Sequence, residues 1–211
     1  MRGVDAPLQS FSPRPPHAHM SAGVIDVWRA DLTAIDNLED LLGADERARA
    51  ERIVPAGKRV LWARSRGVLR ALLGHYLGSD PRALRFALGP HGKPALAHDG
   101  ADEGDLRFNL SHSGDLALVA VSAGREVGVD IERARPRYTA EFLRTWVARE
   151  AVVKCRGLGL GIALAAPGDS TSVVAMRGDP WTAGLEVGPD FAAAIAVEGG
   201  PCELHIRDWR G

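Results

Sequence analysis

Two long amphipathic segments constrain the fold of this chain most. Apolar side chains recur every three or four residues over 58–77, and Gly78 follows as a stop signal. The same spacing extends over 139–156 and is followed by Gly157. Residues 38–53 are also expected to be helical. Because an amphipathic helix has to bury its apolar face against another layer, each long helix is expected to cover a sheet.

Short apolar runs around these segments predict strands. The expected strands lie at residues 24–30, 106–110, 116–122, 126–132, 172–177, 185–187, 191–197 and 203–206. Gly124 lies between the third and fourth of them and predicts a hairpin that joins these two strands. A helix followed by antiparallel-looking strands, twice over, predicts an α+β protein of two similar α/β halves, each a small antiparallel sheet packed with a long helix.

The expected organisation has three parts. Residues 1–22 are rich in Pro and lack periodicity, which predicts a flexible leader. Residues 23–104 are expected to form the N-terminal half, and residues 105–211 the C-terminal half. Residues 115–124 weakly resemble residues 190–199, which fits a pseudo-twofold relation, although shared strand composition explains the likeness equally well.

Composition places the chain among ordinary globular proteins. It has 211 residues, of which 45% are hydrophobic and 25% charged, and its formal net charge is -1. The near-neutral net charge argues against electrostatic binding of nucleic acid by the chain as a whole. No run approaches the ~20 apolar residues that span a bilayer, so no membrane partner is expected. With two cysteines and no signal-peptide pattern, we expect a cytoplasmic protein with reduced thiols, and the two-half architecture favours a monomer.

One segment is strongly basic. Residues 45–70 contain eight Lys or Arg and three acidic residues. Most charge runs are solvated helix faces, and this segment taken alone favours that interpretation. The alternative is a site for phosphate groups.

Three carboxylates and one lysine are the strongest candidates for chemistry. Asp130 and Glu132 alternate along an expected strand, so both point to one face of it. Glu150 lies in the apolar stripe of the second long helix, where an unpaired carboxylate is costly. A helix salt bridge to Lys154 is one explanation. The other is that Glu150 joins Asp130 and Glu132 around one hard cation such as Mg²⁺, with Mn²⁺ as the alternative ion.

Two further segments supply donors suited to phosphate. Lys93 follows Gly92 and precedes Pro94 in a tight turn. Residues 108–114 end a strand with two serines that flank His112. A hydrolase site is disfavoured there because the sequence lacks the nucleophile elbow Gly-x-Ser-x-Gly. Taken alone, His112 is as readily explained as a hydrogen-bonded structural residue as it is as a ligand.

The order of these motifs carries a family resemblance. Gly-Lys-Pro at 92–94, Phe-Asn-Leu-Ser-His-Ser at 108–113, Val-Gly-Val-Asp-Ile-Glu at 127–132 and the Trp-Val-Ala-Arg-Glu-Ala-Val-Val-Lys helix at 146–154 resemble the surfactin-type 4′-phosphopantetheinyl transferases. The resemblance implies transfer of the phosphopantetheine arm of coenzyme A to a serine of an acyl or peptidyl carrier protein, with release of 3′,5′-ADP. It also implies an active site between the two halves.

The resemblance assigns roles to particular residues. It implies that the metal ligands are Asp130, Glu132 and Glu150, that the catalytic residues are Asp130, Glu150 and Lys154, and that coenzyme A is bound by Arg49, Arg52, Lys93, Asn109, Ser111, His112 and Lys154. Within this set Glu150 is the expected base for the carrier serine, directly or through a metal-bound water.

The sequence departs from the family pattern at two places. Arg149 stands where the family usually has Lys, which keeps the charge but changes the donor geometry. The segment 133–145 between Glu132 and Trp146 is shorter than usual and lacks an expected helix. A non-catalytic homologue that binds coenzyme A or a carrier protein is therefore the alternative to an active transferase.

Overall fold

The computed structural model describes residues 23–36, 38–97, 105–158, 178 and 180–210. In chain order the elements are β1 (Val24–Asp31), the 3₁₀ turn η1 (Glu39–Leu41), α1 (Ala44–Glu51), α2 (Ala56–Leu77), β2 (Phe86–Leu88), β3 (Pro94–Leu96), β4 (Leu106–Ser113), β5 (Leu116–Ala123), β6 (Val127–Arg133), α3 (Ala140–Cys155), β7 (Trp181–Gly184), β8 (Phe191–Val197) and β9 (Glu203–Asp208). No helix among these residues has the length and apolarity needed to cross a membrane.

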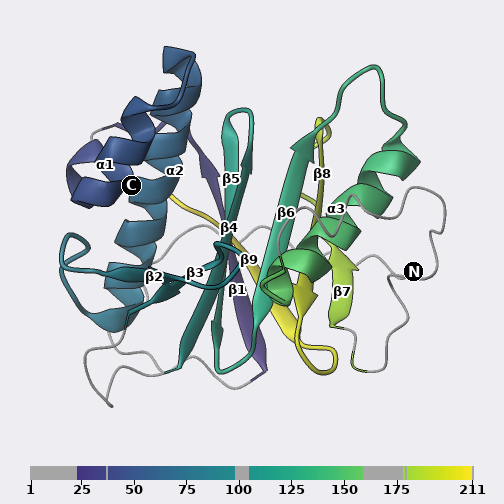
Figure 1. Ribbon diagram of the computed structural model, residues 1–211. Helices are drawn as coiled ribbons and strands as arrows, with labels where there is room; N and C mark the ends of the chain where they lie inside the picture. The colour runs from purple at the N-terminus through teal and green to yellow at the C-terminus, as the bar shows by residue number, and fades with distance from the viewer. Residues whose placement is uncertain (1–22, 37, 98–104, 159–177, 179, 211) are drawn as a thin grey trace.

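Two sheets lie face to face between the two long helices (Figure 1). The first sheet has the order β4-β5-β1-β9, and β9 runs parallel to β1 while the other neighbours are antiparallel. The second sheet is antiparallel, with the order β6-β8-β7. The β2–β3 pair forms a separate small hairpin. The layers therefore follow the order helix, sheet, sheet, helix.

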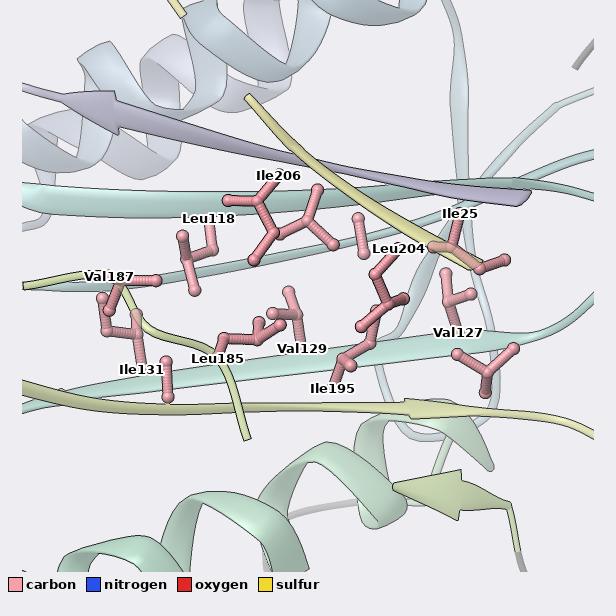
Figure 2. Close-up of a cluster of buried hydrophobic side chains, with 14 residues drawn as sticks. Ile25, Leu118, Val127, Val129, Ile131, Leu185, Val187, Ile195, Leu204 and Ile206 are labelled. Atoms are coloured by element: carbon pink, nitrogen blue, oxygen red, sulfur yellow. The ribbon is translucent and has the colours of Figure 1, made fainter. Parts of the chain in front are cut away.

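The main apolar core fills the space between the two sheets (Figure 2). Ile25 and Leu118 enter it from the first sheet, and Val129, Ile131 and Ile195 enter it from the second. All five side chains are almost completely buried. Because strand side chains alternate, the inward positions of Val129 and Ile131 turn the intervening carboxylates of β6 to the opposite face.

Each long helix covers the outer face of one sheet. Helix α2 packs Val68 and Leu72 on the first sheet, and α3 packs Val147 and Ala151 on the second. Helix α2 ends at Gly78, whose φ of 64° is the left-handed conformation of a helix stop. Helix α3 is capped by Thr139, whose side chain accepts a hydrogen bond from the amide of Phe142, and ends before Gly157 at φ 65°. Both long-helix predictions are confirmed.

The expected α+β class is confirmed, but the predicted hairpin around Gly124 is wrong. Strand β5 pairs with β1 and β4, whereas β6 pairs with β8, so the turn at Gly124 carries the chain from one sheet to the other. Both strands are buried on both faces and find their partners elsewhere in the chain. The expectation of two purely antiparallel sheets is likewise corrected, because the β1–β9 pairing is parallel.

The boundary expected at residues 104 and 105 does not separate the sheets. The sheet beneath α2 takes β1 from before this boundary and β4, β5 and β9 from after it. The helix expected over 38–53 is divided into η1 and α1. Residues 185–187 follow β7 and are not part of a strand. The strand expected at 172–177 and the leader 1–22 lie outside the described residues, and the pseudo-twofold relation stays a prediction.

Candidate active site between β6 and α3

A close approach of α3 to β6 builds the site. Gly128 lies in β6 directly beneath the helix backbone. A Cβ atom at this position would overlap the carbonyl oxygen of Ala151 and the amide nitrogen of Cys155, and would lie 2.9 Å from the Cα atom of Cys155. Only glycine therefore allows this distance between strand and helix. As a result, side chains near the end of α3 reach the polar face of β6.

Strand β4 aligns β6 through side chains. Asn109, Ser111 and Ser113 are alternate residues of β4 and lie on the side of that strand that faces β6. Their hydrogen bonds are Val129 N to Asn109 Oδ1 at 2.9 Å, Ser111 Oγ to Asp130 Oδ1 at 2.9 Å, Ser113 Oγ to Glu132 Oε2 at 2.9 Å and Arg133 N to Ser113 Oγ at 3.1 Å. The two sheets thus meet along β4 and β6, and the carboxylates of β6 are held at this junction.

Lys154 and Asp130 form the centre of the site. The Lys154 Nζ atom donates to Asp130 Oδ1 at 2.5 Å, to Ser111 Oγ at 3.0 Å and to the Val129 carbonyl at 3.3 Å. The Asp130 carboxylate is 4% exposed, and its second oxygen, Oδ2, is buried without a hydrogen-bond partner. An unsatisfied buried carboxylate oxygen is costly, so it is a natural position for a further cation or donor.

Glu150 is the third acid of the cluster and is also 4% exposed. Burial raises the pKa of its carboxyl above the usual range, and the negative charges of Asp130 and Glu132 raise it further, while Lys154 acts in the opposite direction. The acid of α3 therefore lies within electrostatic range of the two acids of β6. The convergence of all three around one cation stays a prediction.

The donor set fits a hard divalent cation. Lys154 pairs with Asp130, the charges of Asp130 and Glu132 act on Glu150, and Oδ2 of Asp130 lacks a hydrogen-bond partner. Carboxylate oxygens are the ligands that Mg²⁺ prefers in proteins. Within the described part of the chain, however, no three His, Cys, Asp or Glu side chains already stand in a metal-holding arrangement. Here Lys154 supplies the positive charge at Asp130.

His112 follows Ser111 on β4 and is partly buried. Burial lowers the pKa of its imidazole below the usual range, and the nearby Lys154 ammonium lowers it further. The ring is therefore neutral at pH 7 and can donate one hydrogen bond from one ring nitrogen.

Lys93 lies at the end of the β2–β3 turn and reaches the other end of the site. Its Nζ atom donates to Glu126 Oε2 at 2.6 Å, to the Val127 carbonyl at 3.0 Å and to the Cys155 carbonyl at 3.1 Å. A cleft of about 610 Å³ opens beside it. Its charged lining consists of His91, Lys93, Arg107 and Arg156 together with the acids Glu126 and Glu198, so basic side chains outnumber acidic ones. The sequence singled out Lys93 but not its partner Glu126, and no local pattern marks that acid.

Arg49 and Arg52 are placed on α1 and at its end, beside α2. The Arg49 guanidinium lies 5.7 Å from the centre of the Trp62 ring, and Arg52 is exposed. In the described part of the chain, no hydrogen bond or ion pair joins either arginine to the carboxylate cluster. Their assignment to coenzyme A stays a prediction.

Part of the basic segment has a structural role. Arg66 and Arg70 both pair with the buried carboxylate of Glu46, with nitrogen–oxygen distances of 2.7 and 2.5 Å. The two guanidinium groups also lie over the Phe86 ring, at 5.1 and 5.0 Å from its centre. These two arginines join α1 to α2 and do not form a solvated face.

Sequence reasoning missed Ser113, which holds Glu132 and the amide of Arg133. The signal was available, because Asn109, Ser111 and Ser113 place a polar side chain at every second position of β4. A buried polar row on a strand indicates that something beside it needs hydrogen bonds. Buried acids beside a lysine, next to a basic cleft, are the chemistry of an enzyme that handles phosphate groups.

Known proteins agree with this class. A family model described as "4′-phosphopantetheinyl transferase, N-terminal" matches residues 26–124. The 4′-phosphopantetheinyl transferase HetI of Nostoc sp. (strain PCC 7120) is 33% identical over 228 aligned residues, covering 90% of this chain and 94% of the relative. The chain therefore belongs to the 4′-phosphopantetheinyl transferase family.

Two shorter matches point the same way. The putative 4′-phosphopantetheinyl transferase slr0495 of Synechocystis sp. (strain PCC 6803) is 30% identical over 156 residues, covering 62% of this chain and 63% of the relative. The 4′-phosphopantetheinyl transferase AcpT of Escherichia coli (strain K12) is 37% identical over 114 residues, covering 42% of this chain and 55% of the relative. The expected 4′-phosphopantetheinyl transferase family is thus confirmed, and the surfactin-type branch stays a prediction.

Proposed function

We propose that this protein transfers the 4′-phosphopantetheine arm of coenzyme A to a serine hydroxyl of an acyl or peptidyl carrier protein and releases 3′,5′-ADP. The observation that carries the proposal is the buried ion pair of Lys154 from α3 with Asp130 from β6, with Glu150 and Glu132 within electrostatic range of Asp130 or of each other. Family membership supports the same activity.

The proposed reaction is a substitution at phosphorus. The serine oxygen forms a bond to the phosphorus atom that carries the pantetheine arm, and the bond from that phosphorus to the oxygen of 3′,5′-ADP breaks. The serine proton passes to Glu150. Glu150 is a buried carboxylate within electrostatic range of Asp130 and Lys154, which suits it to accept this proton.

Several hydrogen-bond donors of the site can interact with the negatively charged phosphates of the substrate. In this proposal Lys154 interacts with the diphosphate and with the developing charge on its leaving oxygen. Ser111 and neutral His112 provide further hydrogen bonds from β4, together with Asn109, which also fixes the amide of Val129. Lys93, in the cleft beside the site, contacts the coenzyme A phosphates. Arg49 and Arg52 are proposed to hold the nucleotide end.

The metal in this proposal is held by Asp130, Glu132 and Glu150. Asp130 Oδ2 has no hydrogen-bond partner and would be the oxygen that takes the ion, while Lys154 pairs with the other oxygen, Oδ1. When bound, Mg²⁺ or Mn²⁺ supplies charge neutralisation at the diphosphate.

Finer assignments follow from the motif order. We propose that the chain belongs to the surfactin-type branch of the family and that it works in the cytoplasm as a monomer. The short connection between Glu132 and Trp146 is the feature that favours the alternative, a homologue that binds coenzyme A or carrier without transfer.

Mass spectrometry of a carrier protein tests the proposal. The protein is incubated with coenzyme A, Mg²⁺ and several apo-carrier proteins, and the carrier is expected to gain the mass of one phosphopantetheine group. Glu150→Gln is expected to lower the rate about 10²–10⁴-fold, since a positioned base contributes that much. Glu39→Gln, an exposed carboxylate on η1, is the matched control and is expected to keep the wild-type rate.

Coenzyme A binding without modification of any carrier would establish the non-catalytic alternative. A full rate in the Glu150→Gln variant would remove the role of Glu150 as base while leaving the transferase activity in place.

A further inference from the structure

Glu126 bridges two cations at the wall of the cleft. It lies directly before β6, and its two carboxylate oxygens have different partners. Oε2 accepts from Lys93 Nζ at 2.6 Å, and Oε1 lies 3.3 Å from Nη1 of Arg107. All three residues line the cleft of about 610 Å³. A carboxylate between two cations occupies the kind of position that a phosphate group takes in an anion site.

Lys93 uses all of its hydrogen-bond donors within the protein. An ammonium group carries three protons. Here they are donated to the Glu126 carboxylate and to the carbonyls of Val127 and Cys155. A hydrogen bond from Lys93 to a phosphate group therefore requires that one of these acceptors leaves.

Glu126 is the acceptor that can leave. The carbonyls of Val127 and Cys155 are fixed, because they belong to β6 and to the last residue of α3. The main chain of Glu126 is fixed as well, since its carbonyl accepts from the amide of Glu198 and from the Cys155 thiol. Its side chain, however, is 37% exposed and can turn to solvent by a change of rotamer. The exchange of Glu126 for another anion therefore needs no movement of a strand or helix.

Arg107 has an unused donor at the same place. Its Nη2 atom pairs with Asp105 at 2.6 Å, and its Nη1 atom faces Glu126. The third nitrogen, Nε, is buried and has no hydrogen-bond partner, which is costly for a charged donor. The distance of 3.3 Å from Nη1 to Glu126 is also longer than the usual value of about 2.7–2.9 Å for such a pair. The Glu126 carboxylate thus satisfies Lys93 well and Arg107 poorly.

We propose that Glu126 is an internal substitute for a phosphate group of coenzyme A, and that its carboxylate holds Lys93 and Arg107 in the free protein and is displaced by phosphate when the substrate binds. This inference rests on the proposed function. A phosphate group offers more oxygens and more negative charge than one carboxylate, so both cations can share it. A singly charged anion gains little by replacing Glu126. Glu126 is therefore a residue that determines specificity for phosphate at this end of the cleft.

Calorimetric titration tests the exchange. Coenzyme A is titrated into the wild type and into Glu126→Gln, which removes the competing charge and keeps the shape of the side chain. The Kd is expected to fall about fivefold in the variant, because a partly exposed ion pair contributes up to about that factor. Glu198→Gln is the charge-matched comparison. It removes an equal charge from the same cleft without touching the two ion pairs of Glu126, and is expected to lower the Kd by less than about twofold.

A second ligand identifies the phosphate group that takes the place of Glu126. 3′-Dephospho-coenzyme A keeps the diphosphate and lacks the 3′-phosphate. A gain in affinity for both ligands supports the exchange and assigns it to the diphosphate. A gain for coenzyme A alone supports the exchange and assigns it to the 3′-phosphate.

Nuclear magnetic resonance of the lysine ammonium groups follows the exchange in the wild type. The chain has three lysines, Lys58, Lys93 and Lys154, so labelling lysine with ¹⁵N gives a spectrum with few ammonium signals. Saturating coenzyme A is expected to shift the Nζ signal of Lys93, because its partner changes from carboxylate to phosphate. Glu126→Gln is expected to shift this signal before any ligand is added. Coenzyme A that binds without moving the Lys93 signal overturns the exchange.

The outcomes separate this inference from the transferase. An unchanged or weaker affinity of Glu126→Gln for both ligands overturns the exchange, while carrier modification by the wild type would leave the transferase in place. Tighter binding by Glu126→Gln, together with no carrier modification by the wild type, supports the exchange and overturns the transferase. A wild type that binds neither ligand overturns both.

Discussion

The substitution Gly128→Ala tests whether close contact between β6 and α3 builds the site. The new Cβ atom would lie 2.9 Å from the Cα atom of Cys155, where ordinary contact begins at 3.4 Å, and nearer still to the carbonyl oxygen of Ala151. Because these are backbone atoms, the helix has to retreat by at least about 0.5 Å. Overpacking of this kind costs about 2 kcal/mol of unfolding free energy. For a chain of 211 residues that lowers the unfolding midpoint by about 4–8 °C.

The same retreat separates Lys154 from Asp130, whose atoms are 2.5 Å apart. A displacement near 1 Å at a reacting centre costs about 10²-fold in rate, so a retreat of at least half that distance is expected to lower transfer by at least about tenfold. Circular dichroism melting and carrier modification measure the two effects. Gly184→Ala is the control, since a Cβ atom at that strand glycine meets nothing within 4 Å. A Gly128→Ala protein with wild-type melting and wild-type rate would refute the reasoning.

Three further predictions concern charge. Glu46→Gln leaves buried Arg70 without its carboxylate, so urea titration should show a loss of about 3 kcal/mol. Burial acts to raise the pKa of Glu46, but Arg66, the amide of Gly43 and Arg70 outweigh it and lower the pKa below 4.5. The contribution of the Glu46 carboxylate to the unfolding free energy is therefore present above pH 4.5 and is lost as pH falls through the folded-state pKa. The wild type should lose more stability on acidification than Glu46→Gln does. Lys154→Met, which leaves Asp130 unpaired, should lower the transfer rate at least about 10²-fold while the protein stays folded by circular dichroism; an unchanged rate would contradict its role. Removing divalent ions with EDTA should abolish transfer, and Mg²⁺ or Mn²⁺ should restore it; full activity in EDTA would exclude the metal.

Local sequence signals predicted the helices and the two carboxylates of β6. Thr139 caps the start of α3 and Gly157 follows its end. Both signals could be read from the sequence because each acts within one turn of the chain. The alternation that turns Asp130 and Glu132 to one face follows from strand geometry alone. The apolar stripe around Glu150 likewise indicated a buried acid with partners.

Pairing between distant segments could not be predicted in the same way. Gly124 signals a turn, but a turn does not state whether its two strands pair, and here they enter different sheets. One of the two interpretations of Glu150 paired it with Lys154 one turn away, yet the shortest contact of Lys154 is with Asp130 on another element. That contact exists because Gly128 lets two backbones touch, and the sequence shows only the glycine.

The parallel pairing of β9 with β1 has a consequence for synthesis. Strand β1 is the first of the described strands to leave the ribosome and β9 is the last, so the edge of β1 stays open until nearly all of the described chain has been translated. An open edge is a template for association with other chains. The nascent chain therefore presents this edge for association until β9 is made, and a chain that ends after β5 but before residue 203 would leave it permanently uncovered.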